Sequence, residues 1–355
     1  MGDVHDDSVS SAREAGLIYV SDRDPGIQRV SRGRGFGYVD AHGKAVRDAK
    51  TLERIRSLVI PPGWRDVWIC ARANGHLQVT ARDARGRKQY RYHPRYREHR
   101  ENGKYEGLVA FAEGLPRIRQ RVRRDLRLRG LPRERVLATL VTLLDRTSIR
   151  VGNAEYARDN QSYGLTTLKD RHAQFKGDTL RLRFKGKSGV EHELELSDRR
   201  LAAIVQRCQD LPGQELFQYL DEEDSARPID SAMVNGYLRD VSGSDVTAKH
   251  FRTWHGTVQA ALQLSKIGTA ESETGSKRNV VAAIKEVAAL LGNRPATCRK
   301  YYVHPAVLDT YEDGTLTDYM ASGIVPRRRN LSSAEVCVLA LLRRALAPAR
   351  RKRAA

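Results

Sequence analysis

The sequence predicts an α+β fold in which a small β-rich N-terminal domain precedes a larger, mainly helical domain. Short alternating segments separated by glycine and proline occupy the first third of the chain, as expected for strands and turns. From about Leu108 onward, apolar residues instead recur at spacings of three and four, as expected for helices. The 355 residues are enough for two domains, each with its own hydrophobic core.

Three alternating segments predict strands in the N-terminal domain: Leu17 to Val20, Val67 to Cys70 and His76 to Thr80. Pro61-Pro-Gly63, just before the second of them, predicts a turn. We place this domain at residues 15–107. The segment before it is polar and acidic, so residues 1–14 are expected to be disordered.

The second domain, placed at residues 108–346, is predicted to be mainly helical. One helical face is formed by Val136, Leu137, Leu140, Val141 and Leu144. Helical spacing returns at Arg199 to Cys208, at Lys249 to Leu264 and at Val280 to Leu291. Gly292 predicts the end of the last of these helices. Residues 347–355 are basic and are expected to form a mobile tail that binds phosphates.

A β-hairpin is predicted to interrupt the helices of this domain. Leu180 to Phe184 and Val190 to Leu196 both alternate between apolar and polar residues. They flank Lys185-Gly-Lys-Ser-Gly189, whose glycines suit a tight turn. The hairpin therefore carries a basic tip.

The chain is strongly basic, with 63 Lys and Arg residues against 43 Asp and Glu residues and a formal net charge of +20. Because cationic side chains release counterions when they contact phosphates, the natural partner is a polyanion such as nucleic acid. A ribosomal or cationic surface protein would share this charge. However, 40% hydrophobic residues and long periodic segments indicate a globular protein with a core.

The sequence also predicts a soluble intracellular protein. No apolar run approaches the ~20 residues that span a bilayer, and the acidic start lacks the features of a signal peptide. The four cysteines, Cys70, Cys208, Cys298 and Cys337, lie far apart, without the paired spacing of a zinc site or the density of a disulfide scaffold. They are expected to be reduced thiols.

Five short segments combine basic, amide and phenol side chains in a fixed order. They are Gly86-Arg-Lys-Gln-Tyr-Arg-Tyr92, Ser148-Ile-Arg-Val-Gly-Asn153, Phe184-Lys-Gly-Lys-Ser-Gly189, Ala248-Lys-His-Phe-Arg-Thr-Trp254 and the segment from Leu290 to Pro305. A guanidinium can grip two phosphate oxygens at once, a loop lysine can protonate a leaving oxygen, and a phenol can serve as a nucleophile. Taken singly, each segment also suits an ordinary solvated helix end, hairpin or strand.

In order and spacing, the five segments resemble the motifs of type IB DNA topoisomerases of the poxvirus and bacterial branch, and the similarity runs from about Leu17 to Leu316. The resemblance implies a β-rich N-terminal domain and a helical catalytic domain of the topoisomerase IB and tyrosine recombinase type, clamped as a monomer around double-stranded DNA. It implies ATP-independent relaxation of supercoiled DNA through a 3′-phosphotyrosine intermediate. It also implies a bacterial cytoplasmic protein associated with the nucleoid.

The resemblance assigns the nucleophile to Tyr302, nine residues after Asn293, and leaves Tyr301 as the alternative. Poxvirus relatives have histidine where this chain has Asn293, so a charged donor is missing there. The amide can still donate a hydrogen bond to a phosphoryl oxygen. His304, shortly after the nucleophile, is expected to be structural.

The same resemblance assigns the catalytic cations. Arg150 and Arg252 match the two catalytic arginines, and Lys187, rather than Lys185, matches the catalytic lysine that follows a glycine. Lys249 matches a supporting DNA contact, and its i,i+3 spacing from Arg252 predicts a shared helix face.

The first of the five segments matches the DNA-facing element of the family's N-terminal domain. The residues expected to contact DNA there are Arg87, Lys88, Gln89, Tyr90 and Tyr92. Amides and phenols can read base edges, while Arg and Lys bind phosphates. Tyr156 matches a further DNA-contacting position more weakly.

Two other classes of protein stay open at this point. A tyrosine recombinase shares the Arg, Lys, Arg, Tyr order but typically has histidine three residues before its second arginine, where this chain has Lys249. A noncatalytic DNA-packaging protein would explain the charge but not the ordered motifs. The sequence contains no Walker-type loop and no Asp, Glu and His cluster with metal-ligand spacing, so we expect no cofactor and no metal.

Overall fold

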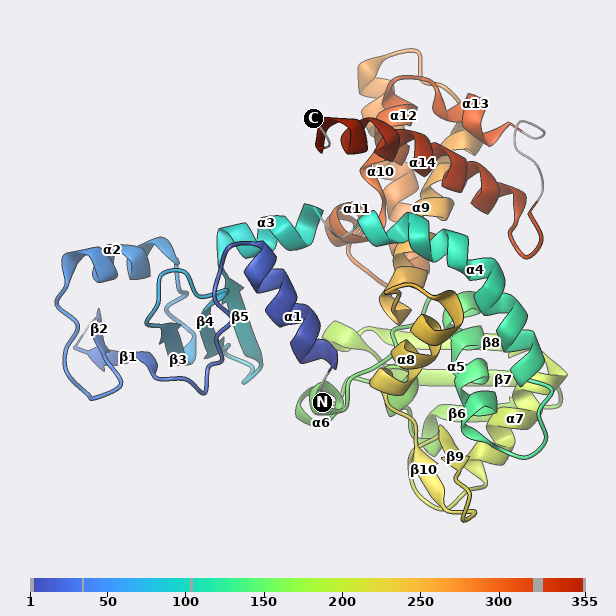
Figure 1. The fold of residues 1–355 in the computed structure, drawn as a ribbon, viewed down its shortest axis with the longest axis horizontal. Coiled ribbons are helices and arrows are strands. Elements are labelled where there is room, and N and C mark those ends of the chain that lie inside the picture. Colours follow the sequence, from blue (N-terminus) through green and yellow to red (C-terminus); the bar gives the residue numbers. More distant parts are fainter. Residues whose placement is uncertain (1–2, 34, 103–104, 322–327, 354–355) are drawn as a thin grey trace. The chain divides into compact units, whose positions relative to one another are not determined.

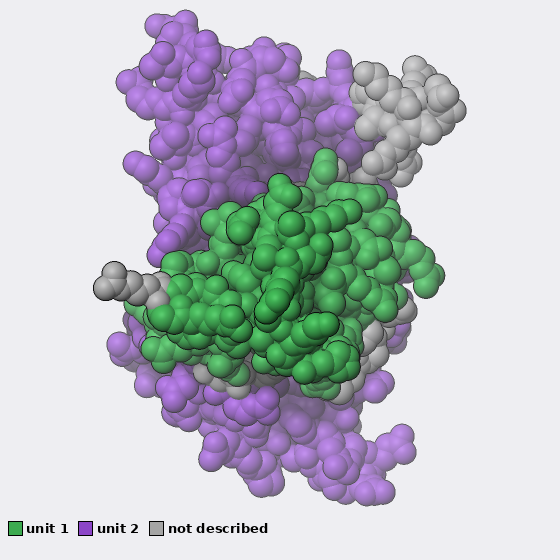
Figure 2. Space-filling view, turned by 90° about the vertical axis from the view of Figure 1, so that its left-hand side faces the viewer, with its two compact units in different colours: residues 1–104 green, residues 105–355 purple. Residues whose placement is uncertain are grey.

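The computed structural model describes residues 3–33, 35–102, 105–321 and 328–353 (Figure 1). The chain divides into two compact units, Met1–Lys104 and Tyr105–Ala355, which Figure 2 shows in separate colours. The sequence predicts a helical domain from residue 108, and unit 2 begins at Tyr105.

Unit 1 is built on a five-stranded antiparallel sheet with the strand order β2-β1-β3-β4-β5. Its strands are β1 (Gly26–Arg32), β2 (Gly35–Val39), β3 (Arg65–Cys70), β4 (Leu77–Arg82) and β5 (Lys88–Tyr92). Its helices are α1 (Asp3–Glu14), α2 (Ala49–Ser57) and α3 (Pro94–Asn102). The predicted strands over Val67 to Cys70 and His76 to Thr80 correspond to β3 and β4.

The core of unit 1 lies between the sheet and α2. Apolar residues of β1, β3 and β4 alternate toward Ile55 of α2, which is 1% exposed. Asp48 begins α2 by accepting a hydrogen bond from the Thr51 amide at 2.7 Å, which satisfies one of the helix's unpaired donors. This packing leaves β5 at the edge of the sheet.

Two predictions for the start of the chain were wrong. Residues 1–14 were expected to be disordered, but Asp3–Glu14 form α1, which packs on α3. Ala12 and Ala15 form a buried apolar cluster with Leu17 and Tyr96. This cluster anchors the helix, although the overall composition of residues 1–14 is polar. Leu17 to Val20 is no strand, because it makes only an isolated bridge between Ile18 and Gly75.

Unit 2 is mainly helical. Its helices are α4 (Glu106–Asp125), α5 (Arg133–Thr147), α6 (Ala154–Asn160), α7 (Arg199–Gln209), α8 (Ser231–Ser242), α9 (Ala248–Ile267), α10 (Glu273–Leu291), α11 (Pro295–Tyr302), α12 (Pro305–Glu312), α13 (Leu316–Met320) and α14 (Ser333–Arg353). The segment expected to be a basic tail at residues 347–355 is helical as far as Arg353. The fold class predicted from the sequence is therefore confirmed.

The central helix of unit 2 is α9, which packs against α4, α5, α10, α11 and α14. It presents small and aromatic residues on several faces, and Phe251 and Trp254 have no exposed surface. Trp254 donates its indole N–H to Glu335 of α14 at 3.0 Å, so this tryptophan belongs to the core, as expected. A helix buried on most sides holds its side chains rigidly, and α9 is the helix that carries Arg252.

The predicted hairpin is present. Strands β7 (Thr179–Lys185) and β8 (Glu191–Ser197) pair in register from Thr179 opposite Ser197 to Lys185 opposite Glu191. The third strand of this sheet is β6 (Ala173–Lys176), and β9 (Gln218–Leu220) with β10 (Ala226–Pro228) forms a separate pair. Short 3₁₀ turns occupy Leu165–Thr167, Asp170–His172 and Lys187–Gly189. The last of these is the hairpin tip.

Candidate active site

Arg150 is positioned by the end of α5. Ser148 caps this helix in the left-handed conformation, with φ 55° and ψ 21°, which turns the chain away from the helix axis. The half-buried side chain of Arg150 then donates from Nη2 to Oδ1 of Asn293 at 2.6 Å. Two residues that are 143 positions apart in the sequence thus meet through a charge-assisted hydrogen bond.

Arg252 lies inside unit 2 and is only 4% exposed. One Nη atom donates to the carbonyl of Ser148, and Nη2 donates to the carbonyl of Leu291 at 2.7 Å. Among the described residues, its Nε has no hydrogen-bond partner. Burial, together with the charge of Arg150, lowers the pKa of Arg252 to about 10, so the guanidinium remains charged at neutral pH. Its two main-chain bonds fix it between the segments that lead to Arg150 and Asn293.

Asn293 follows the end of α10. Gly292 ends the helix with φ 59° and ψ 48°, a left-handed conformation that glycine adopts readily. Because Arg150 can only donate, the amide oxygen of Asn293 faces Arg150 and the amide nitrogen points elsewhere. That Nδ2 atom is buried and has no partner among the described residues. An unpaired buried donor is costly unless a ligand oxygen satisfies it.

Tyr302 is held by backbone contacts between α11 and α9. A Cβ atom added at Gly256 would lie 2.4 Å from the Tyr302 carbonyl oxygen, so the two chains approach this closely only because residue 256 is glycine. The hydroxyl of Thr257 on α9 accepts a hydrogen bond from the His304 amide at 3.1 Å. Tyr105 donates from its hydroxyl to the carbonyl of Val303 at 2.9 Å. The backbone at Tyr302 is therefore fixed on both sides.

The two neighbouring tyrosines have different surroundings. The Arg252 guanidinium carbon lies 5.0 Å from the ring centroid of Tyr302, whose ring is half-buried against the core. Tyr301 is 40% exposed, and Lys300 lies over its ring at 5.5 Å. Burial raises the pKa of Tyr302, but the positive charges of Arg252 and Arg150 outweigh it, and the net effect is a pKa below that of an ordinary phenol. The structure thus brings Arg150, Arg252, Asn293 and Tyr302 together.

Lys187 lies at the exposed tip between β7 and β8, next to Ser188 in the left-handed conformation with φ 66°. A second residue of this hairpin, His192 of β8, lies against the end of α10 next to Asn293, since a Cβ atom at Gly292 would lie 2.9 Å from its Cε1. Burial and the positive charges of Arg150 and Arg252 lower the pKa of His192, so its imidazole is within electrostatic reach of both arginines. Nothing in the sequence pattern indicates a role for this histidine.

Lys249 lies on the first turn of α9 and is exposed, whereas Arg252 is buried. The two residues lie on one helix at i,i+3 spacing, as expected, and they differ in exposure. Tyr156 lies in α6, and its side chain falls outside the described residues. His304 is buried and accepts a hydrogen bond from the Ala306 amide at 3.1 Å, so it caps α12, in keeping with a structural role.

In unit 1, the expected DNA-contacting residues divide between the two faces of β5. Tyr90 and Tyr92 are exposed on one face, with ring centroids 6.2 Å apart and nearly parallel planes. Gln89 points to the other face and donates to Asp83 at 2.9 Å. Lys88 forms an ion pair with Asp22 at 2.7 Å, and Arg87 pairs with Asp83.

Sequence reasoning missed a polar network behind the catalytic candidates. Ser148 shares a hydrogen bond of 2.6 Å with Nδ1 of His255, whose Nε2 lies 3.4 Å from Asp145. Asp145 accepts two hydrogen bonds from Arg119, and Arg119 also bonds Glu335. The carbonyl of Ser148 is the one that holds Arg252, so the network supports the backbone on which that arginine depends.

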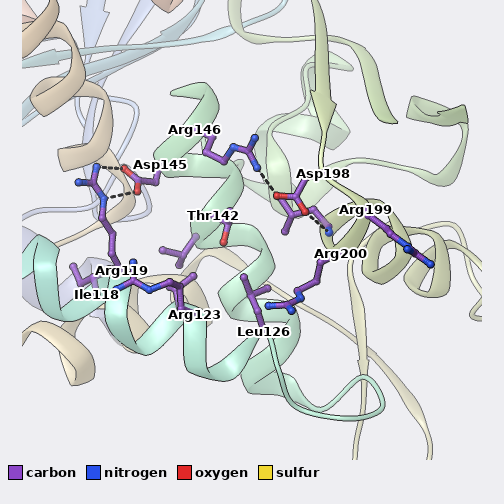
Figure 3. A pocket seen from close by; sticks show the side chains of 13 residues that line it. Ile118, Arg119, Arg123, Leu126, Thr142, Asp145, Arg146, Asp198, Arg199 and Arg200 are labelled. Carbon is purple, nitrogen blue, oxygen red and sulfur yellow. Dashed lines mark hydrogen bonds and ion pairs between the residues drawn. The ribbon is translucent and has the colours of Figure 1, made fainter. Parts of the chain in front are cut away.

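Part of this network lines a groove of about 480 Å³ between α4, α5 and the start of α7. Figure 3 shows the ion pair between Arg119 and Asp145 on one side and the pair between Arg146 and Asp198 on the other. None of the catalytic candidates lines this groove. Duplex DNA needs an extended surface rather than an enclosed pocket, so the groove is not the expected substrate site.

No group of three or more His, Cys, Asp or Glu side chains among the described residues could hold a metal ion. No helix in that part of the chain is both long and apolar enough to cross a membrane. The four cysteines are buried and form no disulfide.

Comparison with known proteins identifies the class. The family model described as the catalytic core of eukaryotic DNA topoisomerase I matches residues 93–321, and the model described as the N-terminal domain of bacterial DNA topoisomerase IB matches residues 35–83. The first match alone covers more than half of the chain and contains Arg150, Arg252, Asn293 and Tyr302. The chain therefore belongs to the type IB DNA topoisomerases, and it relaxes DNA.

Individual relatives agree with this family. The chain is 29% identical over 295 residues to DNA topoisomerase 1B of Acanthamoeba polyphaga mimivirus, covering 81% of this chain and 88% of the relative. It is 22% identical over 281 residues to DNA topoisomerase 1B of vaccinia virus, covering 77% and 86%. The predicted family and the predicted enzyme class are confirmed, and the N-terminal match is to a bacterial domain.

Proposed function

We propose that Tyr302 is the nucleophile that joins the enzyme to DNA. The observation that carries this proposal is the Arg252 guanidinium, 5.0 Å from the Tyr302 ring, in a group that also includes Arg150 and Asn293. Positive charge beside a phenol favours the phenolate that must develop as the oxygen attacks phosphorus. Tyr301, in contrast, is 40% exposed, and Lys300 lies over its ring.

Arg150, Arg252 and Asn293 stabilise the charge that develops on the phosphoryl oxygens. Arg252 is fixed by two main-chain carbonyls, so it contributes charge and its remaining Nε donor from a set position. The unpaired Nδ2 of Asn293 suits one phosphoryl oxygen. Donors that are already in place cost no reorganisation during the reaction, and loss of one typically costs ~2.7–4 kcal/mol of transition-state stabilisation.

Lys187 acts as the general acid. As the Tyr302 oxygen forms its bond to phosphorus, the bond from phosphorus to the 5′ oxygen breaks, and that oxygen takes a proton from Nζ of Lys187. The phenol proton leaves to solvent. The product is a 3′-phosphotyrosine and a free 5′ hydroxyl. Religation runs the same steps in reverse, so the bond energy stays in the adduct and ATP is not needed.

Unit 1 contributes DNA contacts from β5, and a single chain closes around the duplex. The exposed, stacked rings of Tyr90 and Tyr92 offer flat surfaces and hydroxyls to the DNA, and Lys88 and Arg87 offer charge once they exchange their carboxylate partners for phosphates. Gln89, Lys249 and Tyr156 complete the proposed contacts. With duplex DNA as its substrate and a bacterial-type N-terminal domain, the protein is proposed to reside on the nucleoid, where a fluorescent fusion should coincide with DNA stain.

A 5′-bridging phosphorothiolate strand tests these roles. Replacing the leaving oxygen with sulfur removes the need for a proton, because a thiol has a reference pKa of ~8.5 and its thiolate leaves unaided. Lys187→Ala should cleave an ordinary strand slowly and the sulfur strand nearly as fast as the wild type. Arg150→Ala should stay slow on both strands, because its task is to hold phosphoryl oxygens. If sulfur fails to rescue Lys187→Ala, the acid role of Lys187 is lost, and Lys249 becomes the next candidate.

A further inference from the structure

His192 occupies an unusual position on the hairpin that carries Lys187. It lies on β8 directly opposite Phe184 of β7, and the two rings stack with centroids 5.1 Å apart and an interplanar angle of 16°. Its imidazole is half-buried, whereas the neighbouring Glu191 and Glu193 are exposed. The ring therefore points toward the body of unit 2, on the face of the hairpin opposite to these carboxylates.

Two glycines make room for this ring, one on each side of it. A Cβ atom at Gly186 would lie 2.6 Å from Cδ2 of His192, and a Cβ atom at Gly292 would lie 2.9 Å from Cε1. Both distances are shorter than real Cβ contacts allow. The imidazole thus fills the space between the turn of the hairpin and the end of α10, in direct contact with both backbones.

The two glycines directly precede two of the residues to which we assign roles in the reaction. Gly186 is followed by Lys187, and Gly292 is followed by Asn293. The last paired residues of the hairpin are Lys185 and Glu191, so Lys187 lies beyond the strand ladder. Main-chain hydrogen bonds from Gly186 to Val190 at 2.7 Å and from Gly189 to Gly186 at 3.1 Å close the turn, and the ring of His192 adds a side-chain contact immediately before the lysine.

We propose that His192 is a positioning residue that docks the hairpin tip on the end of α10, so that Lys187 and Asn293 face the same phosphodiester. This inference rests on the proposed role of Lys187 as the general acid. The docking contact is made by an uncharged ring, since burial and the neighbouring Arg150 and Arg252 lower the pKa of His192. A neutral ring can pack between two glycines without adding a third positive charge beside the arginines.

His192→Ala, tested on the ordinary and the 5′-bridging phosphorothiolate strand, separates this role from a general structural one. General acid catalysis typically contributes about 10²–10⁴-fold, and a misplaced acid loses part of it. We expect His192→Ala to cleave the ordinary strand about 10-fold or more slowly than the wild type, and the sulfur strand at nearly the wild-type rate. Glu193→Ala, on the exposed face of the same strand, is the matched control and should cleave both strands normally.

Gly186→Ala reaches the same contact from the other partner. The backbone at Gly186 has φ −92° and ψ −167°, which alanine adopts without strain, so the only conflict is with the His192 ring. This variant should reproduce the sulfur-rescued defect. In the His192→Ala background, Gly186→Ala should slow cleavage much less than it does in the wild type, because the imidazole that the added methyl group would contact is absent.

The possible outcomes are distinct. Wild-type cleavage of the ordinary strand by both single variants would overturn the inference, as would slow cleavage of both strands, which would place His192 with the phosphate-binding groups instead. Lys187→Ala is run beside them. If sulfur fails to rescue Lys187→Ala, the general-acid assignment itself falls and the His192 inference with it, whereas rescue of Lys187→Ala without rescue of His192→Ala removes only the inference.

Discussion

Replacing Gly256 with alanine should displace the proposed nucleophile in a protein that still folds. Gly256 lies inside α9, and a Cβ atom there would be 2.4 Å from the carbonyl oxygen of Tyr302 and 3.2 Å from its Cβ. Ordinary van der Waals contact begins at 3.4 Å, so Tyr302 would have to withdraw by about 1 Å. A misplacement of about 1 Å can slow an enzymatic step by about 10²-fold. We expect a loss of that order in the rate of covalent cleavage.

The assay is single-turnover formation of the covalent adduct, measured beside thermal unfolding. Gly236→Ala is the matched control, because Gly236 also lies inside a helix, α8, and an added Cβ would meet nothing within 4 Å. It should cleave normally and gain about 0.4–1 kcal/mol of stability. A folded Gly256→Ala variant that cleaves at the wild-type rate would show that Tyr302 reacts without being held against α9.

Three further predictions concern charge and protonation. Burial raises the pKa of Tyr302, but the charges of Arg252 and Arg150 outweigh burial, so the net pKa is lowered. Single-turnover cleavage of a phosphorothiolate strand should therefore rise with pH to an inflection below the pKa of an ordinary phenol. Arg150→Gln should move this inflection to higher pH, and an unmoved inflection would count against the role of Tyr302. Burial lowers the pKa of His304 to about 4, so an unfolded His304 binds a proton below its ordinary pKa of 6.5 while the folded one does not. His304 should therefore reduce the free energy of unfolding of the wild type by about 1.4 kcal/mol per pH unit as the pH falls from about 6.5 to 4. Urea unfolding of His304→Asn should lack this pH-dependent loss, and parallel pH curves for the two proteins would contradict the prediction. Relaxation should persist in excess chelator, because Arg150, Arg252 and Lys187 supply the positive charge, and a complete loss that added metal restores would defeat this expectation.

Local patterns predicted the elements that carry the site. The alternation around Lys187 predicted the hairpin, and the three- and four-residue spacing predicted α5, α9 and α10. These signals work because a strand and a helix each repeat their buried face at a fixed period. The motif order then supplied the candidate residues before any geometry was known.

The contacts that join those elements could not be predicted in this way. Asn293 accepts from Arg150 across 143 residues, and Arg119 bonds Glu335 across 216 residues. The left-handed Ser148 and the close approach at Gly256 leave no mark on hydrophobic periodicity. His192 reads as one polar position in an alternating strand, and only the packing of the hairpin on α10 reveals what its ring contacts.

Formation of the covalent adduct shows which tyrosine attacks the DNA. Wild type, Tyr302→Phe and Tyr301→Phe are each trapped on a cleavable duplex and run on a denaturing gel, with noncovalent binding measured in parallel. We predict that Tyr302→Phe binds DNA nearly as well as the wild type but forms no adduct, because only the attacking oxygen is lost, while Tyr301→Phe still forms one. An adduct that persists in Tyr302→Phe and disappears in Tyr301→Phe would contradict the account.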